Sequence, residues 1–224
     1  MDKNNSSPEI KTGGAERLPS VKHMIIYVVV HMIVYFTTNR VSFLGYRHDV
    51  VCRLDEILPV VKPFILPYCI WFPYMALTAL YLLKKDMNKL KRLVKSIMIS
   101  TIPVYLVFIF FPTTMPLRPD HIDGNDILTL LLNLIYFFDN NTNVFPSLHV
   151  LWTLMAFTAH VYDGVSKKPV LLISDTVIAV LICLSTFMIK QHSALDVIGA
   201  LPFYLLGWYF TYGKGSGADV STAS

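Results

Sequence analysis

The sequence predicts an all-α membrane protein with six transmembrane helices and one short re-entrant or interfacial helix. Of its 224 residues, 54% are hydrophobic and only 15% are charged, and the mean hydropathy is +0.52. A soluble domain of this size does not need so much apolar surface to fill its core. Apolar runs near the length of about 20 residues that crosses the hydrocarbon recur along the chain, with basic residues beside them.

The predicted spans follow one another through most of the chain. They cover residues 21–38, 63–83, 96–111, 146–161, 170–189 and 194–212. Residues 127–138 are also apolar, but this run is short, so it fits a re-entrant or interfacial helix better than a full crossing. We expect one membrane domain, residues 21–212, between disordered polar tails at residues 1–20 and 213–224.

The basic residues predict the orientation. The densest basic loop runs from Lys84 to Lys95, and Lys167 with Lys168 mark another. Short connections rich in Lys and Arg stay on the cytoplasmic side. With six spans, both termini are then cytoplasmic, and residues 118, 147–149 and 190–196 meet on the outer face of a multi-pass protein that we assign to the cell membrane.

Charge and cysteine content exclude several classes of protein. The net charge is only +4, and the basic residues lie beside apolar runs without interleaved aromatic residues, which favours contact with the bilayer and argues against nucleic-acid binding. Cys52, Cys69 and Cys183 are scattered singly, so neither a disulfide framework nor a thiolate metal site is indicated. The sequence leaves the oligomeric state open.

Two histidines stand at the borders of apolar runs and have polar partners close in sequence. Asp196 follows His192 by four residues, which is one helical turn. Asp196 can therefore accept the imidazole N–H and leave the other ring nitrogen free as a nucleophile. His149 follows Ser147 at the start of the fourth predicted span. We predict that His192, His149 and Asp196 are catalytic residues.

The groups expected beside these histidines suit a phosphate. Arg118 offers a planar fork for two phosphate oxygens, Lys190 offers a compact positive charge, and Ser147 offers a hydroxyl. Phosphoryl transfer mainly needs charge neutralisation and in-line positioning. In this scheme His192 attacks phosphorus, while His149 protonates the leaving alcohol and then activates water.

The scheme needs no metal ion and no other cofactor. A zinc site built from His121, His149, His192 and an aspartate is an alternative, because zinc accepts these ligand types. The histidines lack the paired helical spacing of common metal motifs, and the basic residues nearby would oppose a cation.

At these residues the sequence resembles the type 2 phosphatidic acid phosphatase superfamily, which contains lipid phosphate phosphatases and phosphotransferases. The family's motifs are Lys-x6-Arg-Pro, Pro-Ser-Gly-His and Ser-Arg-x5-His-x3-Asp. The first survives as Arg118-Pro119, with Phe111 at the lysine position. The second reads Pro146-Ser147-Leu148-His149, so that Leu148 replaces glycine.

The third motif runs from Ser185 through His192 to Asp196, with Thr186 in place of arginine. The resemblance implies a six-helix core, a phosphohistidine on His192, proton transfer by His149 and a lipid substrate whose phosphate reaches the membrane surface. The residues expected to bind that phosphate are Arg118, Ser147, Leu148, Lys190 and Ser185.

These observations predict a membrane phosphatase that hydrolyses a lipid phosphate monoester or diphosphate. One alternative is a lipid phosphotransferase that moves a phosphoalcohol headgroup, because residues 145–149 resemble the branch that includes the inositol phosphorylceramide synthases. Another alternative is a non-catalytic membrane scaffold, which the missing first-motif lysine favours.

Overall fold

The computed structural model describes residues 18–42, 44–163 and 168–213, which form eight α-helices and two very short strands. The helices are α1 (Val21–Arg40), α2 (Arg53–Ile57), α3 (Ile65–Lys85), α4 (Met87–Phe110), α5 (Ile127–Phe138), α6 (Leu148–Tyr162), α7 (Pro169–Met188) and α8 (Ala194–Trp208). A 3₁₀ turn (Lys62–Phe64) precedes α3, a π-helical turn (Tyr209–Gly213) follows α8, and β1 (His48–Asp49) pairs in parallel with β2 (Thr113–Thr114). The two predicted tails lie mostly outside the described residues.

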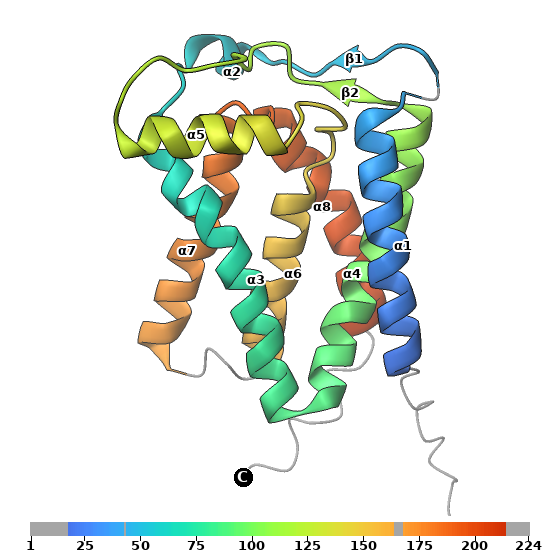
Figure 1. The fold of residues 1–224 in the computed structure, drawn as a ribbon. Coiled ribbons are helices and arrows are strands. Elements are labelled where there is room, and N and C mark those ends of the chain that lie inside the picture. Colours follow the sequence, from blue (N-terminus) through green and yellow to red (C-terminus); the bar gives the residue numbers. More distant parts are fainter. Residues whose placement is uncertain (1–17, 43, 164–167, 214–224) are drawn as a thin grey trace, which may run out of the picture.

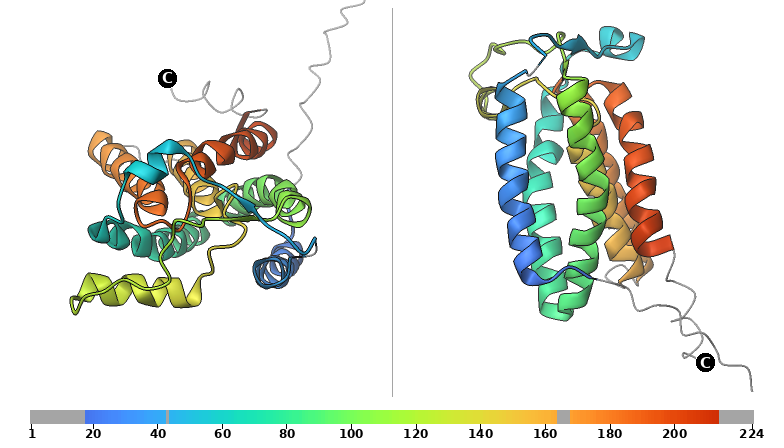
Figure 2. Two further views of the ribbon diagram at one scale, coloured as in Figure 1. Left: turned by 90° about the horizontal axis from the view of Figure 1, so that it is seen from above. Right: turned by 90° about the vertical axis from the view of Figure 1, so that its right-hand side faces the viewer.

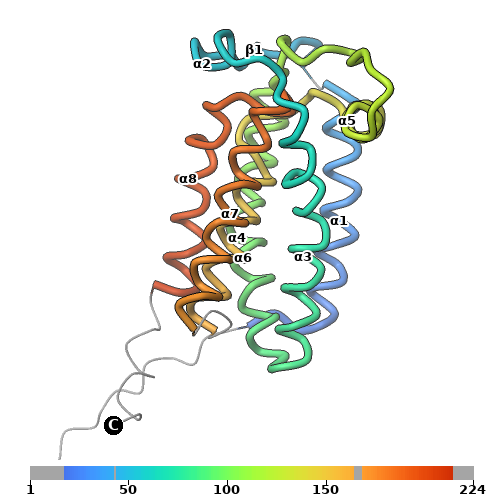
Figure 3. Tube along the Cα trace, turned by 90° about the vertical axis from the view of Figure 1, so that its left-hand side faces the viewer, coloured from blue at the N-terminus to red at the C-terminus, as the bar shows by residue number. Residues whose placement is uncertain are grey.

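The bundle consists of α1, α3, α4, α6, α7 and α8, and α5 crosses one of its ends (Figure 1). The central helix is α6, which contacts α3, α4, α7 and α8 (Figure 2). The helix α5 lies on the side of the bundle formed by α1 and α3, whereas α2 lies toward α8 (Figure 3). The start of α1 and the end of α8 lie at the end of the bundle opposite α5 (Figure 1).

Within the described ranges, five helical segments are long and apolar enough to cross a membrane. They are Val21–Arg40, Lys62–Lys85, Met87–Phe110, Pro169–Met188 and Ala194–Gly213. The sixth helix of the bundle, α6, has 15 residues, about 22 Å of helix against a hydrocarbon core of about 30 Å. The all-α membrane fold predicted from the sequence is confirmed, with a short central helix among candidate spans of 20 or 24 residues.

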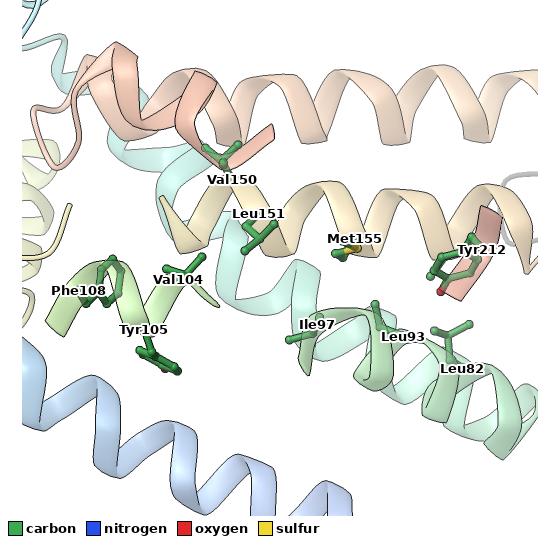
Figure 4. Close-up of a cluster of buried hydrophobic side chains, with 12 residues drawn as sticks. Leu82, Leu93, Ile97, Val104, Tyr105, Phe108, Val150, Leu151, Met155 and Tyr212 are labelled. Carbon is green, nitrogen blue, oxygen red and sulfur yellow. The ribbon is translucent and has the colours of Figure 1, made fainter. Parts of the chain in front are cut away.

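The main hydrophobic core lies where α4 and α6 face each other (Figure 4). Val104 of α4 and Leu151 and Met155 of α6 are fully buried there. The helix α8 closes on this core through Gly207, because a Cβ atom at this position would lie only 2.7 Å from the carbonyl oxygen of Ser96. Large apolar side chains cover the outside of the bundle, as expected for a surface that faces lipid.

The third span starts earlier than the sequence predicts. The helix α4 begins at Met87 instead of residue 96, and only Asp86 separates it from α3. The Asp86 side chain accepts a hydrogen bond of 2.8 Å from the backbone N–H of Asn88, and so caps the new helix. The prediction of a basic loop from Lys84 to Lys95 is therefore wrong, because these residues lie on helical turns at the end of the bundle.

The predicted short helix is present as α5, with the bounds expected from the sequence. Asp126 caps its start, since Oδ1 accepts the N–H groups of Leu128 and Thr129 at 3.0 Å each. One side of the helix packs on the bundle through Leu132 and Tyr136. The other side exposes the apolar residues Ile127, Leu130, Leu134, Phe137 and Phe138. An amphipathic helix lying across a bundle end suits the membrane interface.

Candidate active site

A cavity of about 320 Å³ opens beneath α5, and both predicted catalytic histidines line it. Its walls come from α1, α3, α4, α5, the start of α6, the segment between α5 and α6 and the loop between α7 and α8. Aromatic and aliphatic side chains such as Phe36, Phe72 and Phe138 line one part, and amide side chains line another. The cavity therefore offers an apolar region and a polar region next to the histidines.

His192 lies in the loop before α8, where two acceptors hold one nitrogen of its ring. Nδ1 lies 3.1 Å from Oδ2 of Asp196 and 2.8 Å from the carbonyl oxygen of Val144. Because both partners are acceptors, the ring carries its proton on Nδ1, and Nε2 has no hydrogen-bond partner among the described residues. Asp196 also accepts the Ser193 N–H at 2.8 Å, which fixes the carboxylate in the first turn of α8.

His149, in the first turn of α6, is held by packing. Its ring centroid lies 4.4 Å from that of Trp71 and 4.8 Å from that of Tyr68, both on α3. The centroids of His149 and His192 are 5.7 Å apart, with their planes at 67°. No described residue forms a hydrogen bond with the His149 ring, so both of its nitrogens are open to a bound molecule.

The start of α6 lies beside the two histidines. Ser147 is fully buried, and its Oγ accepts the Val150 N–H at 3.4 Å and so caps the helix. Leu148, the first residue of α6, lines the cavity together with His149. The unpaired N–H groups and the dipole of a helix N-terminus favour an anion. Leu148 therefore lies at the cavity, whereas the buried Ser147 is not among its lining residues in the described structure.

Arg118 is anchored next to the cavity and is not one of its lining residues in the described structure. Nη1 donates to the carbonyl oxygen of Asp139 at 2.6 Å and to Oε1 of Gln191, which does line the cavity. Nη2 donates to the carbonyl oxygen of Tyr136 at 3.2 Å, and the guanidinium lies 4.7 Å from the centre of that ring. Burial lowers the pKa of Arg118, an effect that the Asp139 carboxylate opposes.

Lys190 and Ser185 have partners away from the cavity. The Lys190 Nζ donates to the carbonyl oxygen of Asp55, which lies on α2, between the bundle helices α1 and α3 in the sequence. Burial lowers the pKa of this ammonium group, and the Asp55 carboxylate opposes the effect. Ser185 Oγ donates to the carbonyl oxygen of Ile182 at 2.6 Å, within its own helix. The structure brings neither side chain to the histidines.

Phe111 and Thr186 stand where the family motifs have lysine and arginine, and each makes contacts with neighbouring residues. Phe111 stacks on His48, with ring centroids 4.0 Å apart. The Thr186 hydroxyl donates to the Cys183 carbonyl at 2.8 Å, while the Thr186 carbonyl accepts the His192 N–H at 3.0 Å. Thr186 therefore supports the loop through its backbone and supplies no charge.

Sequence reasoning missed several residues that complete the site. Asp55 accepts from Ser193 Oγ at 2.5 Å and from the Ala194 N–H at 3.0 Å, so it ties α2 to the start of α8. Asp139 and Gln191 line the cavity and contact each other. The only signals were local: Gln191 precedes His192, and Asp139 ends an apolar run.

The comparisons with known proteins identify the family of the chain. A family model described as PAP2 superfamily matches residues 64–210, which cover the histidines and all three motif regions. The chain belongs to the PAP2 superfamily, whose membership supports a phosphatase-type function. No curated protein and no solved structure matches the chain.

Proposed function

We propose that this protein is a lipid phosphatase, which hydrolyses a lipid phosphate monoester or diphosphate through a phosphohistidine intermediate and without a metal ion. The observation that carries this proposal is the pair His149 and His192, whose ring centroids lie 5.7 Å apart in one cavity. Within the described structure, His192 is held at Nδ1 and open at Nε2, whereas His149 is open at both nitrogens. One ring is suited to attack and the other to proton transfer.

In the first half-reaction, Nε2 of His192 forms a bond to phosphorus as the bond from phosphorus to the leaving oxygen breaks. Protonated His149 gives its proton to that oxygen, which leaves as an alcohol, or as a phosphate when the substrate is a diphosphate. Asp196 stabilises the positive charge that develops on His192. The N–H groups at the start of α6 offset charge on the phosphoryl oxygens, and the Arg118 guanidinium, bound to the lining residue Gln191, adds positive charge beside the cavity.

The second half-reaction returns the enzyme to its starting state. His149, now neutral, takes a proton from water while the water oxygen attacks phosphorus. The bond between phosphorus and His192 Nε2 breaks, inorganic phosphate leaves, and His149 is protonated again. Each step uses protons and electron pairs that the two imidazoles, the lipid and water supply.

The position of the cavity supports a lipid as the substrate. Phe36, Phe72 and Phe138 line the cavity and are also more than half exposed on the outside of the bundle. An acyl chain can follow these side chains into hydrocarbon while the phosphate reaches the histidines. The basic residues favour an orientation with the site on the outer face and both termini in the cytoplasm, and we assign the protein to the cell membrane.

Phosphate release by purified protein in detergent tests this proposal. We expect release from phosphatidic acid or a polyprenyl diphosphate in the presence of a chelator, and we expect His192→Ala to abolish it. His121→Ala is the matched control, because His121 is an exposed histidine at the same end of the bundle. Release that survives His192→Ala and needs added zinc would contradict the proposal.

A second candidate, a lipid phosphotransferase, is favoured by two amide side chains. Asn39 and Asn143 line the cavity, are only 7% and 5% exposed, and leave their Oδ1 atoms without a hydrogen-bond partner. Buried acceptors of this kind favour a ligand that carries hydroxyl groups. A bound alcohol would then replace water in the second half-reaction.

A labelled phospholipid and an acceptor lipid separate the two candidates. Headgroup transfer without phosphate release supports the transferase, and release without transfer supports the phosphatase. Neither reaction with any lipid supports a non-catalytic membrane scaffold.

A further inference from the structure

Asp139 is the residue that caps the C-terminal end of α5, and it lies in the wall of the cavity. Its carboxylate accepts hydrogen bonds from the hydroxyls of Tyr35 and Tyr68, at 3.0 Å each, and from Nε2 of Gln191 at 2.9 Å. These donors belong to α1, α3 and the loop before α8. One carboxylate therefore joins three separate segments at the edge of the candidate site.

We propose that Asp139 is a positioning residue of this site, which sets Arg118 in place through Gln191 and sets His149 in place through Tyr68. The inference rests on the proposed function, since it assigns Asp139 to the phosphate-binding group and to the proton-transferring group of that reaction. Asp139 itself does not transfer a proton in this account.

The first arm of the network fixes the amide of Gln191. A carboxylate only accepts hydrogen bonds, so Asp139 selects the orientation in which the Gln191 NH₂ group faces it. The amide oxygen Oε1 then points to Arg118, which donates to it from Nη1. The Asp139 carbonyl oxygen accepts from the same Nη1 at 2.6 Å. Gln191 is only 2% exposed, so its amide cannot turn toward solvent instead.

The second arm reaches His149 through an aromatic ring. Tyr68 is 1% exposed, and its hydroxyl is directed to Oδ2 of Asp139. The same ring packs against His149 at 4.8 Å between centroids. Because no described residue holds His149 by a hydrogen bond, the packing of Tyr68 and Trp71 decides where its ring lies. A displaced Tyr68 would displace His149.

Kinetics of Asp139→Asn and Tyr68→Phe separate the two arms. An asparagine at position 139 places an NH₂ group among donors and lets Gln191 turn its oxygen away from Arg118. We expect its kcat to fall by about tenfold or more and its affinity for inorganic phosphate to weaken similarly, since misplacement of about 1 Å can cost about 10²-fold. Tyr68→Phe keeps the aromatic ring and the contacts of Arg118 but removes the hydroxyl that bonds to Asp139. Its kcat should therefore fall, while its affinity for phosphate stays unchanged.

Asp126→Asn is the matched control, because it makes the same chemical change at the other end of α5. Asp126 caps the start of this helix and lies outside the cavity. We expect its kcat and its phosphate affinity to equal those of the wild type. If Asp139→Asn does not fold, Gln191→Leu tests the Arg118 arm, with weakened phosphate affinity as the expected result.

Two results would overturn the inference. One is that Asp139→Asn only lowers the melting temperature, with kcat and phosphate affinity equal to those of Asp126→Asn, because Asp139 would then only tie α5 to the bundle. The other is that Tyr68→Phe keeps the wild-type kcat.

Phosphate binding can be measured as a rise in melting temperature when inorganic phosphate is added. This measurement distinguishes a failure of the inference from a failure of the proposed function. A wild-type protein that binds phosphate without turning over any lipid contradicts the proposed function, while Asp139→Asn still tests the Arg118 arm. A wild-type protein that neither binds nor releases phosphate overturns both.

Discussion

The carboxylate of Asp196 accepts the Nδ1–H of His192 at 3.1 Å, and the carbonyl oxygen of Val144 accepts from the same nitrogen at 2.8 Å. Two acceptors on one N–H fix both the tautomer and the rotation of the ring. The proposed nucleophile, His192, is thus held both by the backbone of the segment before α6 and by a side chain of α8.

Asp196→Asn should slow turnover while leaving the fold intact. The substitution removes the charge that stabilises a positive His192, but Val144 still accepts the Nδ1–H. We therefore expect kcat to fall by about 10²-fold, less than the loss of about 10⁴-fold that follows the same change in a Ser-His-Asp triad, because Val144 still selects the tautomer. Phosphate release and the melting temperature measure the two effects, with Asp123→Asn, an exposed carboxylate, as the control. A wild-type kcat would remove Asp196 from the mechanism.

Asp55→Asn should destabilise the protein in a pH-dependent way. Burial alone would raise the pKa of the Asp55 carboxyl, but hydrogen bonds from Ser193, Ala194 and Cys52 outweigh it, and the pKa is lowered. A lowered pKa in the folded state contributes stability above the unfolded value of about 3.9, and this contribution is lost as the pH falls.

Melting temperatures of the wild type and Asp55→Asn at several pH values measure this contribution. We expect the largest difference near neutral pH and a narrowing gap below about pH 4, where Asp55 becomes protonated. A difference in melting temperature that is constant with pH would show that the charge of Asp55 does not hold α2 on the loop before α8.

Tyr74→Phe should lower stability without lowering turnover. In the half of the bundle away from the cavity, Tyr74 donates to Oδ1 of Asp175 at 2.9 Å, His160 Nδ1 lies 2.9 Å from Oδ2, and Thr78 pairs with His160 Nε2. Hydrogen bonds to charged groups contribute about 1.5–3 kcal/mol. We expect a lower melting temperature with an unchanged kcat, and a large loss of kcat would instead assign this group to the reaction.

Removal of metal ions should leave the reaction rate unchanged. The proposed bond-making and proton transfers involve His149, His192, the lipid and water, so EDTA should not slow phosphate release, and added Zn²⁺ should not accelerate it. Loss of activity in EDTA that Zn²⁺ restores would revive the alternative in which the histidines hold a metal ion.

The fold could be predicted because hydropathy reports directly on surfaces that face lipid. The order of the spans and the short helix at residues 127–138 were predicted from apolar runs, and the family resemblance is confirmed by the PAP2 match. The start of α4 could not be predicted in this way. A run of basic residues has the same low hydropathy whether it continues a helix beyond the hydrocarbon or forms a loop.

The site was predictable where a short spacing or the order of the spans brings residues together, and the structure places His149 and His192 in one cavity, as the order of the spans predicts. The contact between His192 and Asp196 follows from a four-residue spacing. By contrast, Lys190 reaches a carbonyl 135 residues away, in α2, and no spacing predicts that contact. Asp139 likewise gains its place from α1 and α3, which only the folded bundle brings near it.

The most direct test of the central claim is to trap the phosphorylated enzyme. Wild-type protein mixed with ³²P-labelled phosphatidic acid and quenched in alkali within milliseconds should carry an acid-labile label on the peptide that contains His192. His192→Ala should carry no label, and the label on His149→Ala should be lost more slowly than that on the wild type, because this variant cannot activate water. Phosphate release without any labelled enzyme, or label in His192→Ala, would contradict the account.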